Sequence, residues 1–78
     1  MKQKMSGTQL FSRAVRGALV VQHGSVKTAC ERCGTMSGTT MYSKLRDPNN
    51  LTIKQLRDLR KICRWSKEEM AQHLMEVL

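Results

Sequence analysis

Apolar residues recur every three to four positions along most of the chain, which is the spacing of one face of an α-helix. The pattern predicts five helices, at residues 7–23, 26–33, 37–46, 53–64 and 67–77. The inward face expected for the first helix consists of Phe11, Ala14, Val15, Ala18, Leu19 and Gln22. That of the fourth helix consists of Ile53, Leu56, Leu59, Ile62 and Cys63, and that of the fifth consists of Met70, Ala71, Leu74, Met75 and Leu78. No segment shows a convincing strand pattern, so the predicted fold is all-α.

Helix starts are marked by capping boxes, in which a Ser or Thr is followed three residues later by Glu or Gln. The chain contains three of these boxes: Ser6…Gln9, Thr52…Gln55 and Ser66…Glu69. Each box is flanked by an apolar pair that adds a hydrophobic staple: Met5 with Leu10, Leu51 with Leu56, and Trp65 with Met70. Three boxes in one short chain support an all-helical domain.

The segment 25–48 has the pattern of two short helices joined by a turn. Such a pair needs a small residue where the helices cross and a Gly where the first helix ends, which are the roles predicted for Cys30 and Gly34. Met41 and Leu45, four residues apart on the second helix, are predicted to face the core. The opposite side of that helix is then short, polar and uncharged at its N-terminal end.

Short hydroxyl side chains on an outward helix suit the major groove of DNA, because they can donate to or accept from base edges. The residues predicted to read bases are Ser37, Thr39, Thr40, Tyr42, Ser43 and Arg46. Ser25, Lys27 and Lys44 are predicted to bind phosphates beside the positive N-terminal ends of the two helices. The competing interpretation is a surface helix that is merely solvated.

The charge of the chain favours a polyanionic partner. Fourteen Lys and Arg stand against six Asp and Glu, a net charge of +8 in 78 residues. Such an excess attracts nucleic acid first and an anionic membrane surface second. No apolar run approaches the roughly 18 residues of a membrane span, so we expect a cytoplasmic protein with no membrane association. Residues 1–5 are expected to form a flexible tail, and residues 6–78 a single DNA-binding domain.

The spacing of Cys30 and Cys33 also allows a zinc site, with Cys63 and His73 or His23 as further ligands. A second closely spaced pair, which zinc sites usually have, is missing. Three cysteines without a secretory signal instead indicate reduced thiols that pack as small hydrophobic groups. No nucleophile–base set or carboxylate pair can be assembled. We therefore expect a non-enzyme without a cofactor, a bound metal or a small-molecule substrate.

The run GTMSGTTMYSKLRDPNNLTIKQLRDLRKICRWSKEEM resembles the lambda-repressor-like (Cro/C1-type) DNA-binding domains of phages and their hosts. Phage members often open the recognition helix with Ser-x-x-Thr-aromatic-Tyr and leave it through basic-Leu-x-x-Pro. Those places are held here by Ser37, Thr40, Met41, Tyr42, Leu45 and Pro48. The resemblance covers residues 10–78 and implies a five-helix domain with a helix-turn-helix, binding as a dimer to a two-fold operator.

Two features depart from the family pattern. The small crossing residue is usually Ala, whereas here Ala29 is one place early and Cys30 is in register with Gly34. The turn, residues 35–37, is also one residue longer than usual. Both departures affect the angle between the two helices of the predicted motif.

These observations predict a small phage-type transcription regulator, a repressor that occupies a double-stranded DNA operator. Four apolar residues near the C-terminus exceed what a small core needs and are predicted to form a homodimer contact: Trp65, Met70, Leu74 and Leu78. The alternative from another class is a small basic protein-interaction module, such as an antirepressor or adaptor, that uses the same fold.

Overall fold

The computed structural model describes residues 6–34 and 36–78, and the secondary structure of this part of the chain is all helical, without a strand. Its elements are α1 (Gly7–His23), α2 (Val26–Cys33), α3 (Gly38–Arg46), the short 3₁₀ helix η1 (Pro48–Asn50), α4 (Ile53–Cys63) and α5 (Lys67–Met75). The prediction of an all-α chain with five α-helices is confirmed. The third helix begins one residue later than predicted, the fourth ends one residue earlier and the fifth ends two residues earlier, while η1 was not predicted.

All five α-helices begin after a Ser or Thr whose hydroxyl accepts a hydrogen bond from the backbone N–H three residues on. The three predicted capping boxes are confirmed, because in each the Gln or Glu side chain also accepts from the N-cap N–H. These return bonds measure 2.9 Å for Gln9, 3.0 Å for Gln55 and 3.0 Å for Glu69. Met5 of the first predicted staple lies outside the described residues.

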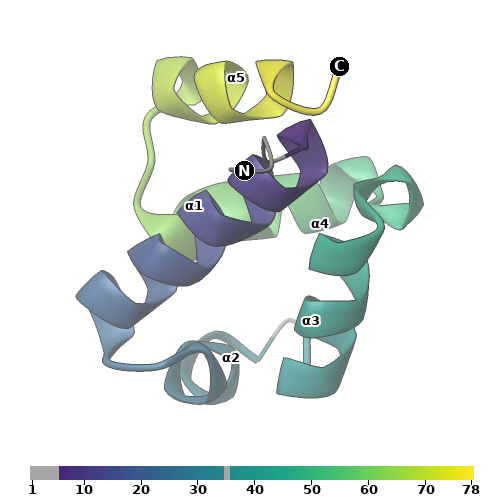
Figure 1. Cartoon of the computed structure of the whole chain (residues 1–78). Coiled ribbons are helices and arrows are strands. Elements are labelled where there is room, and N and C mark those ends of the chain that lie inside the picture. The colour runs from purple at the N-terminus through teal and green to yellow at the C-terminus, as the bar shows by residue number, and fades with distance from the viewer. Residues whose placement is uncertain (1–5, 35) are drawn as a thin grey trace, which may run out of the picture.

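Helix α1 lies at the centre of the packing, since α2, α3, α4 and α5 all contact it (Figure 1). Its buried stripe consists of Phe11, Val15 and Leu19, which are spaced four residues apart and have no exposed surface. Burying side chains of this size contributes about 1.5–3 kcal/mol each to folding. The apolar stripe of this one helix is therefore the centre around which the other helices pack.

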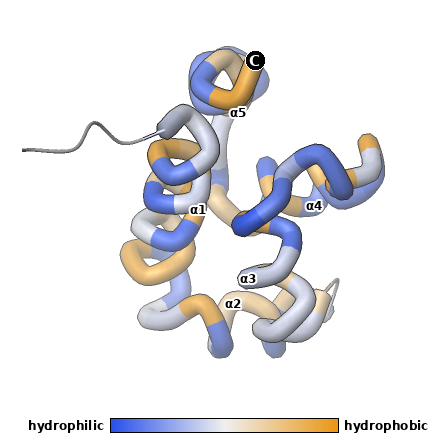
Figure 2. Tube along the Cα trace, turned by 45° about the vertical axis from the view of Figure 1, so that its right-hand side comes forward, coloured by the Kyte–Doolittle hydropathy of each residue, from blue (hydrophilic) through white to orange (hydrophobic). Residues whose placement is uncertain are grey.

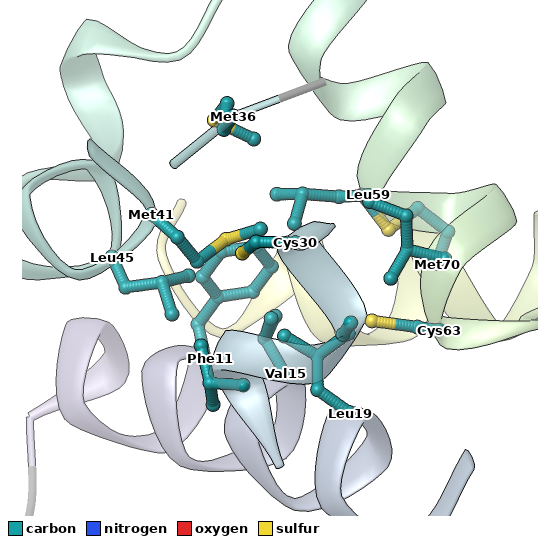
Figure 3. Packing of buried hydrophobic residues seen from close by; sticks show 13 residues of the cluster. Phe11, Val15, Leu19, Cys30, Met36, Met41, Leu45, Leu59, Cys63 and Met70 are labelled. Carbon is teal, nitrogen blue, oxygen red and sulfur yellow. The ribbon is translucent and has the colours of Figure 1, made fainter. Parts of the chain in front are cut away.

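The other helices each contribute one or more side chains to the same core (Figure 3). The buried residues beyond α1 are Val26, Ala29 and Cys30 of α2, Met36 of the turn, Met41 and Leu45 of α3, Leu59, Ile62 and Cys63 of α4, and Met70 of α5. Cys30 points toward Met41 and the ring of Phe11, as expected for a residue where α2 and α3 meet (Figure 3).

Four predicted core residues lie instead at the surface: Ala71, which is exposed within α5, and three residues at or near helix ends. Ile53 is 67% exposed, Met75 is 68% exposed and Leu78 is 93% exposed. Ile53 is the first residue of α4, and α5 ends at Met75, so these side chains lie beyond the ends of the shared core. Helical periodicity places a residue on one face of a helix, but it does not show how far along the helix another helix covers that face.

The C-terminal ends of α1 and α4 are joined by a histidine. The Nε2 atom of His23 lies 3.0 Å from the backbone oxygen of Ile62, to which it donates when the proton is on Nε2. The other ring nitrogen, Nδ1, is buried and has no hydrogen-bond partner within the described part of the chain. His23 thus links two helices that are distant in sequence.

Within the described residues, no helix has the length and apolar character that crossing a lipid bilayer demands.

The start of α1 approaches the end of α5 so closely that a side chain at Gly7 would overlap the backbone oxygen of Glu76. Gly7→Ala should therefore lower the free energy of unfolding by about 1–3 kcal/mol, the range for overpacking. Urea unfolding followed by the fluorescence of Trp65, the sole tryptophan, measures the change.

Gly17→Ala is the matched control in the same helix. Nothing lies within 4 Å of a methyl group at that position, and Ala is a better helix former than Gly. Stability should rise by about 0.5–1 kcal/mol. Equal effects of the two substitutions would contradict the close approach of α1 to α5.

Candidate nucleic-acid interface

Helices α2 and α3 are connected through a turn in which Gly34 and Met36 have defined roles. Gly34 ends α2 in the left-handed conformation, with φ 64°, and its N–H donates to the oxygen of Cys30 at 2.9 Å. A residue with a side chain would be strained at this φ. Met36, in the turn, is only 8% exposed and packs into the core, a role that the sequence did not reveal. Thr35, within the predicted longer turn, lies outside the described residues.

The orientation of α3 follows from its two buried residues. Met41 is fully buried and Leu45 is 1% exposed, so the predicted inner face is confirmed. Thr39, Ser43 and Arg46 are exposed on the other side. In Figure 2 the first turns of α3 are pale and its C-terminal end is blue, as small hydroxyl residues give way to charged ones. The exposed face of α3 is thus uncharged where it begins and cationic where it ends.

Two of the six residues predicted to read bases also cap α3. The Ser37 hydroxyl accepts from the N–H of Thr40 at 3.2 Å and donates to the Thr40 hydroxyl at 3.0 Å. Ser25 and Thr28 make the same pair of bonds at the start of α2, at 3.0 Å and 2.9 Å. The spacing is that of a capping box with Thr in place of Glu, and this Ser-x-x-Thr repeat is the signal in the sequence that could have identified both pairs.

The three residues predicted to bind phosphates have different surroundings. Lys27 is exposed on the first turn of α2. The hydroxyl of Ser25 is occupied by the cap. The Nζ atom of Lys44 donates to the backbone oxygen of Asn50 at 2.9 Å, which ties the end of α3 to η1. Of the three, Lys27 has the side chain that is best placed to meet a ligand.

A hollow lies between α1 and α3, and four polar side chains line it: Ser12 and Arg16 from α1, and Tyr42 and Arg46 from α3. A second hollow adjoins it and shares Ser12, Arg16 and Arg46 as lining residues. We call this region the α1–α3 hollow. Ser12 and Arg16 are not on the predicted inward face of α1, and residue spacing does not show which helix lies beside its polar side.

Charge is distributed unevenly over the helices. Helices α1 and α3 carry Arg13, Arg16, Lys44 and Arg46 and no acidic residue. Three of the six acidic residues of the chain, Glu68, Glu69 and Glu76, lie in α5 or directly after it. Helix α4 has a larger cationic excess, with Lys54, Arg57, Arg60 and Lys61 against Asp58. Positive charge therefore predominates on α1, α3 and α4, but not on α5.

The cysteines and histidines do not come together as a metal site. Within residues 6–34 and 36–78, no three His, Cys, Asp or Glu side chains could share a metal ion. Cys30 and Cys63 lie in the core, and burial raises the pKa of both thiols, that of Cys63 to about 12. His73 stacks on Trp65, with ring centroids 4.2 Å apart. The zinc alternative, which needs these side chains to converge, is thus not supported by their positions.

The four residues predicted to form a dimer contact differ in how far they are buried. Met70 is 6% exposed and belongs to the core of its own chain. Trp65 and Leu74 are half-buried against that core, whereas Leu78 is 93% exposed. Together with the exposed Met75, Leu78 forms an apolar C-terminal end, orange in Figure 2.

The chain matches no protein-family model, and comparisons with curated proteins and with solved structures give no match either.

Substitution of two serines should distinguish a hydroxyl that caps α3 from one that is only exposed on it. Ser37→Ala removes the N-cap and should lower the free energy of unfolding by about 1 kcal/mol. Ser43→Ala changes an exposed hydroxyl in the same helix and should stay within about 0.5 kcal/mol. Thermal or urea unfolding of the two variants measures the difference, and an equally large loss from Ser43→Ala would show that its hydroxyl is structural.

The three thiols should differ in reactivity in the folded protein. A thiol reagent at neutral pH should modify the half-buried Cys33 first, because a buried thiol with a raised pKa supplies little thiolate. Cys30 and Cys63 should react only as the protein opens. Peptide mass spectrometry over a time course identifies the order, and rapid modification of Cys63 without denaturant would contradict its burial.

Proposed function

We propose that this protein is a sequence-specific double-stranded DNA-binding protein of the lambda-repressor-like type, in which α2 and α3 form the helix-turn-helix. The observation that carries the proposal is the fixed orientation of α3. Met41 and Leu45 hold its inner side in the core and leave Thr39 and Ser43 exposed on a face without negative charge. A helix of this kind fits the width of the major groove.

The short side chains on that face support base reading. Thr39 and Ser43 are too short to reach across a wide gap, so they suit a helix whose backbone lies close to the base edges. Their hydroxyls can donate or accept, and the Thr methyl group can contact the methyl group of thymine. Neither hydroxyl is needed for the cap of α3, which Ser37 and Thr40 provide.

Contacts with the DNA backbone would hold the protein in register. The N-terminus of α2 offers the positive end of its helix dipole, and Lys27 adds a charge at its first turn. Phosphate contacts position a protein on the duplex and base contacts give sequence preference. Lys27 therefore belongs to the first group, while Thr39 and Ser43 belong to the second.

We further propose that the protein binds as a homodimer to an operator with two-fold symmetry and acts as a small repressor by occupying it. The apolar C-terminal end, Met75 and Leu78, and the half-buried Leu74 supply a surface for a second copy. A two-fold dimer requires two half-sites related by the same symmetry. The two half-sites would then be about one helical turn of DNA apart.

Selection of bound sites from random duplex DNA tests the proposal. The bound pool should converge on one sequence with two-fold symmetry. On that sequence Thr39→Ala or Ser43→Ala should relax the preference at one base pair by about 1–3 kcal/mol. Lys27→Ala should instead weaken binding to all sequences alike and reduce the salt slope by about 1.

The two groups of variants act as controls for each other. If substitutions at Thr39, Ser43 and Lys27 all weaken every sequence equally, α3 is not the reading helix. If the pool does not converge, the proposal of sequence-specific DNA binding is wrong, and the protein-interaction module gains support.

A further inference from the structure

The α1–α3 hollow gathers groups of one chemical kind. Arg16 and Arg46 line it from opposite helices, and the hydroxyls of Ser12 and Tyr42 complete its rim. Tyr42 is 46% exposed, so its phenol is accessible at the surface. All four side chains can donate a hydrogen bond, and the two guanidinium groups carry a permanent positive charge. A ligand for this hollow would therefore be an anion with several acceptor oxygens.

The two arginines line the same hollow without compensation by a carboxylate. Among the described residues, neither of them forms an ion pair with an acidic side chain. Asp47 follows Arg46 directly, but its Oδ2 atom accepts from Asn50 at 2.9 Å within the η1 turn. Arg16 uses its Nε atom to donate to the backbone oxygen of Ser12 at 3.4 Å, which leaves its two terminal nitrogens for a ligand. Two like charges in one hollow repel each other until an anion lies between them.

We propose that the α1–α3 hollow binds one phosphate of the DNA backbone, with Arg16 and Arg46 as its principal donors. The inference rests on the proposed function and changes the roles within it. Arg46 and Tyr42, which the sequence predicted to read bases, become phosphate ligands together with Arg16 and Ser12. Arginine suits this role because its planar group can bind a phosphate through two parallel hydrogen bonds.

The geometry of α3 places this phosphate on the duplex that the helix reads. With about 100° between successive residues, Tyr42 lies about 100° around α3 from Ser43, and Arg46 lies about 60° from it on the same side. When Ser43 and Thr39 face the base edges, Tyr42 turns toward the wall of the groove. Arg46 lies within about 20° of Thr39 around the axis but about 10 Å further along it, at the end of α3 that shares the hollow with Arg16. The wall of the groove is the sugar–phosphate backbone, and α1 brings Arg16 to the same side.

The test uses the full chain and the duplex sequence obtained by selection. Arg16→Gln should weaken binding about tenfold, the loss expected for a hydrogen bond to a charged group, for all sequences alike. It should also reduce the salt slope by about 1. Arg57→Gln is the matched control, since Arg57 is exposed on α4 and does not line the hollow. Arg46→Gln should act as Arg16→Gln does and leave base preference unchanged.

Neutral methylphosphonate groups, introduced one at a time into the duplex backbone, locate the phosphate. One position should weaken binding of the unsubstituted protein and have no further effect on Arg16→Gln or Arg46→Gln. Unfolding curves check that both variants remain folded, as expected for exposed residues.

The phosphate site and the proposed DNA binding can be disproved separately. If the protein binds its selected sequence and Arg16→Gln behaves as Arg57→Gln does, the phosphate site is wrong while the DNA-binding proposal stands. A loss of preference at a single base pair in Arg46→Gln would likewise overturn the site, because it would return Arg46 to base reading. If no duplex is bound at all, both proposals fall together.

Discussion

One stripe of α1 determines where the other helices of this protein lie. Phe11, Val15 and Leu19 are fully buried, and every other α-helix packs on α1. In a chain of 78 residues the core is small, so few side chains are available to hold any helix in place. Loss of volume in this stripe would therefore disturb several interfaces at once, and the positions of α2 and α3 depend on it directly.

The orientation of α3 is the part of this arrangement that bears on function. Because Met41 and Leu45 lie in the core, Thr39 and Ser43 lie outside it. The same rotation brings the Arg46 side of α3 against α1, where Arg16 lies. Apolar packing on one side of a nine-residue helix thus creates two polar surfaces on the other, one uncharged and one cationic. The proposed division between base reading and phosphate binding follows from that geometry.

Much of the fold could be predicted from the sequence because its signals are local. Capping boxes, Gly34 and helical periodicity identified all five α-helices and the inner face of α3. Contacts between helices were harder to predict, since periodicity gives a face but not its neighbour. For that reason the buried Met36 and the α1–α3 hollow were missed, and Ile53 was wrongly assigned to the core. Among the predicted site residues, Ser37 was a cap whose Thr partner fell outside the usual Glu or Gln pattern.

If the exposed face of α3 contacts DNA while α5 does not, the amide chemical shifts of the labelled protein should show it. Titration with the selected duplex should shift the amides of Thr39 and Ser43 strongly and change those of α5 little, whereas a scrambled duplex of equal length should leave Thr39 and Ser43 nearly unchanged. Shifts concentrated in α5, or the same small shifts with both duplexes, would show that α3 is not the helix that reads DNA.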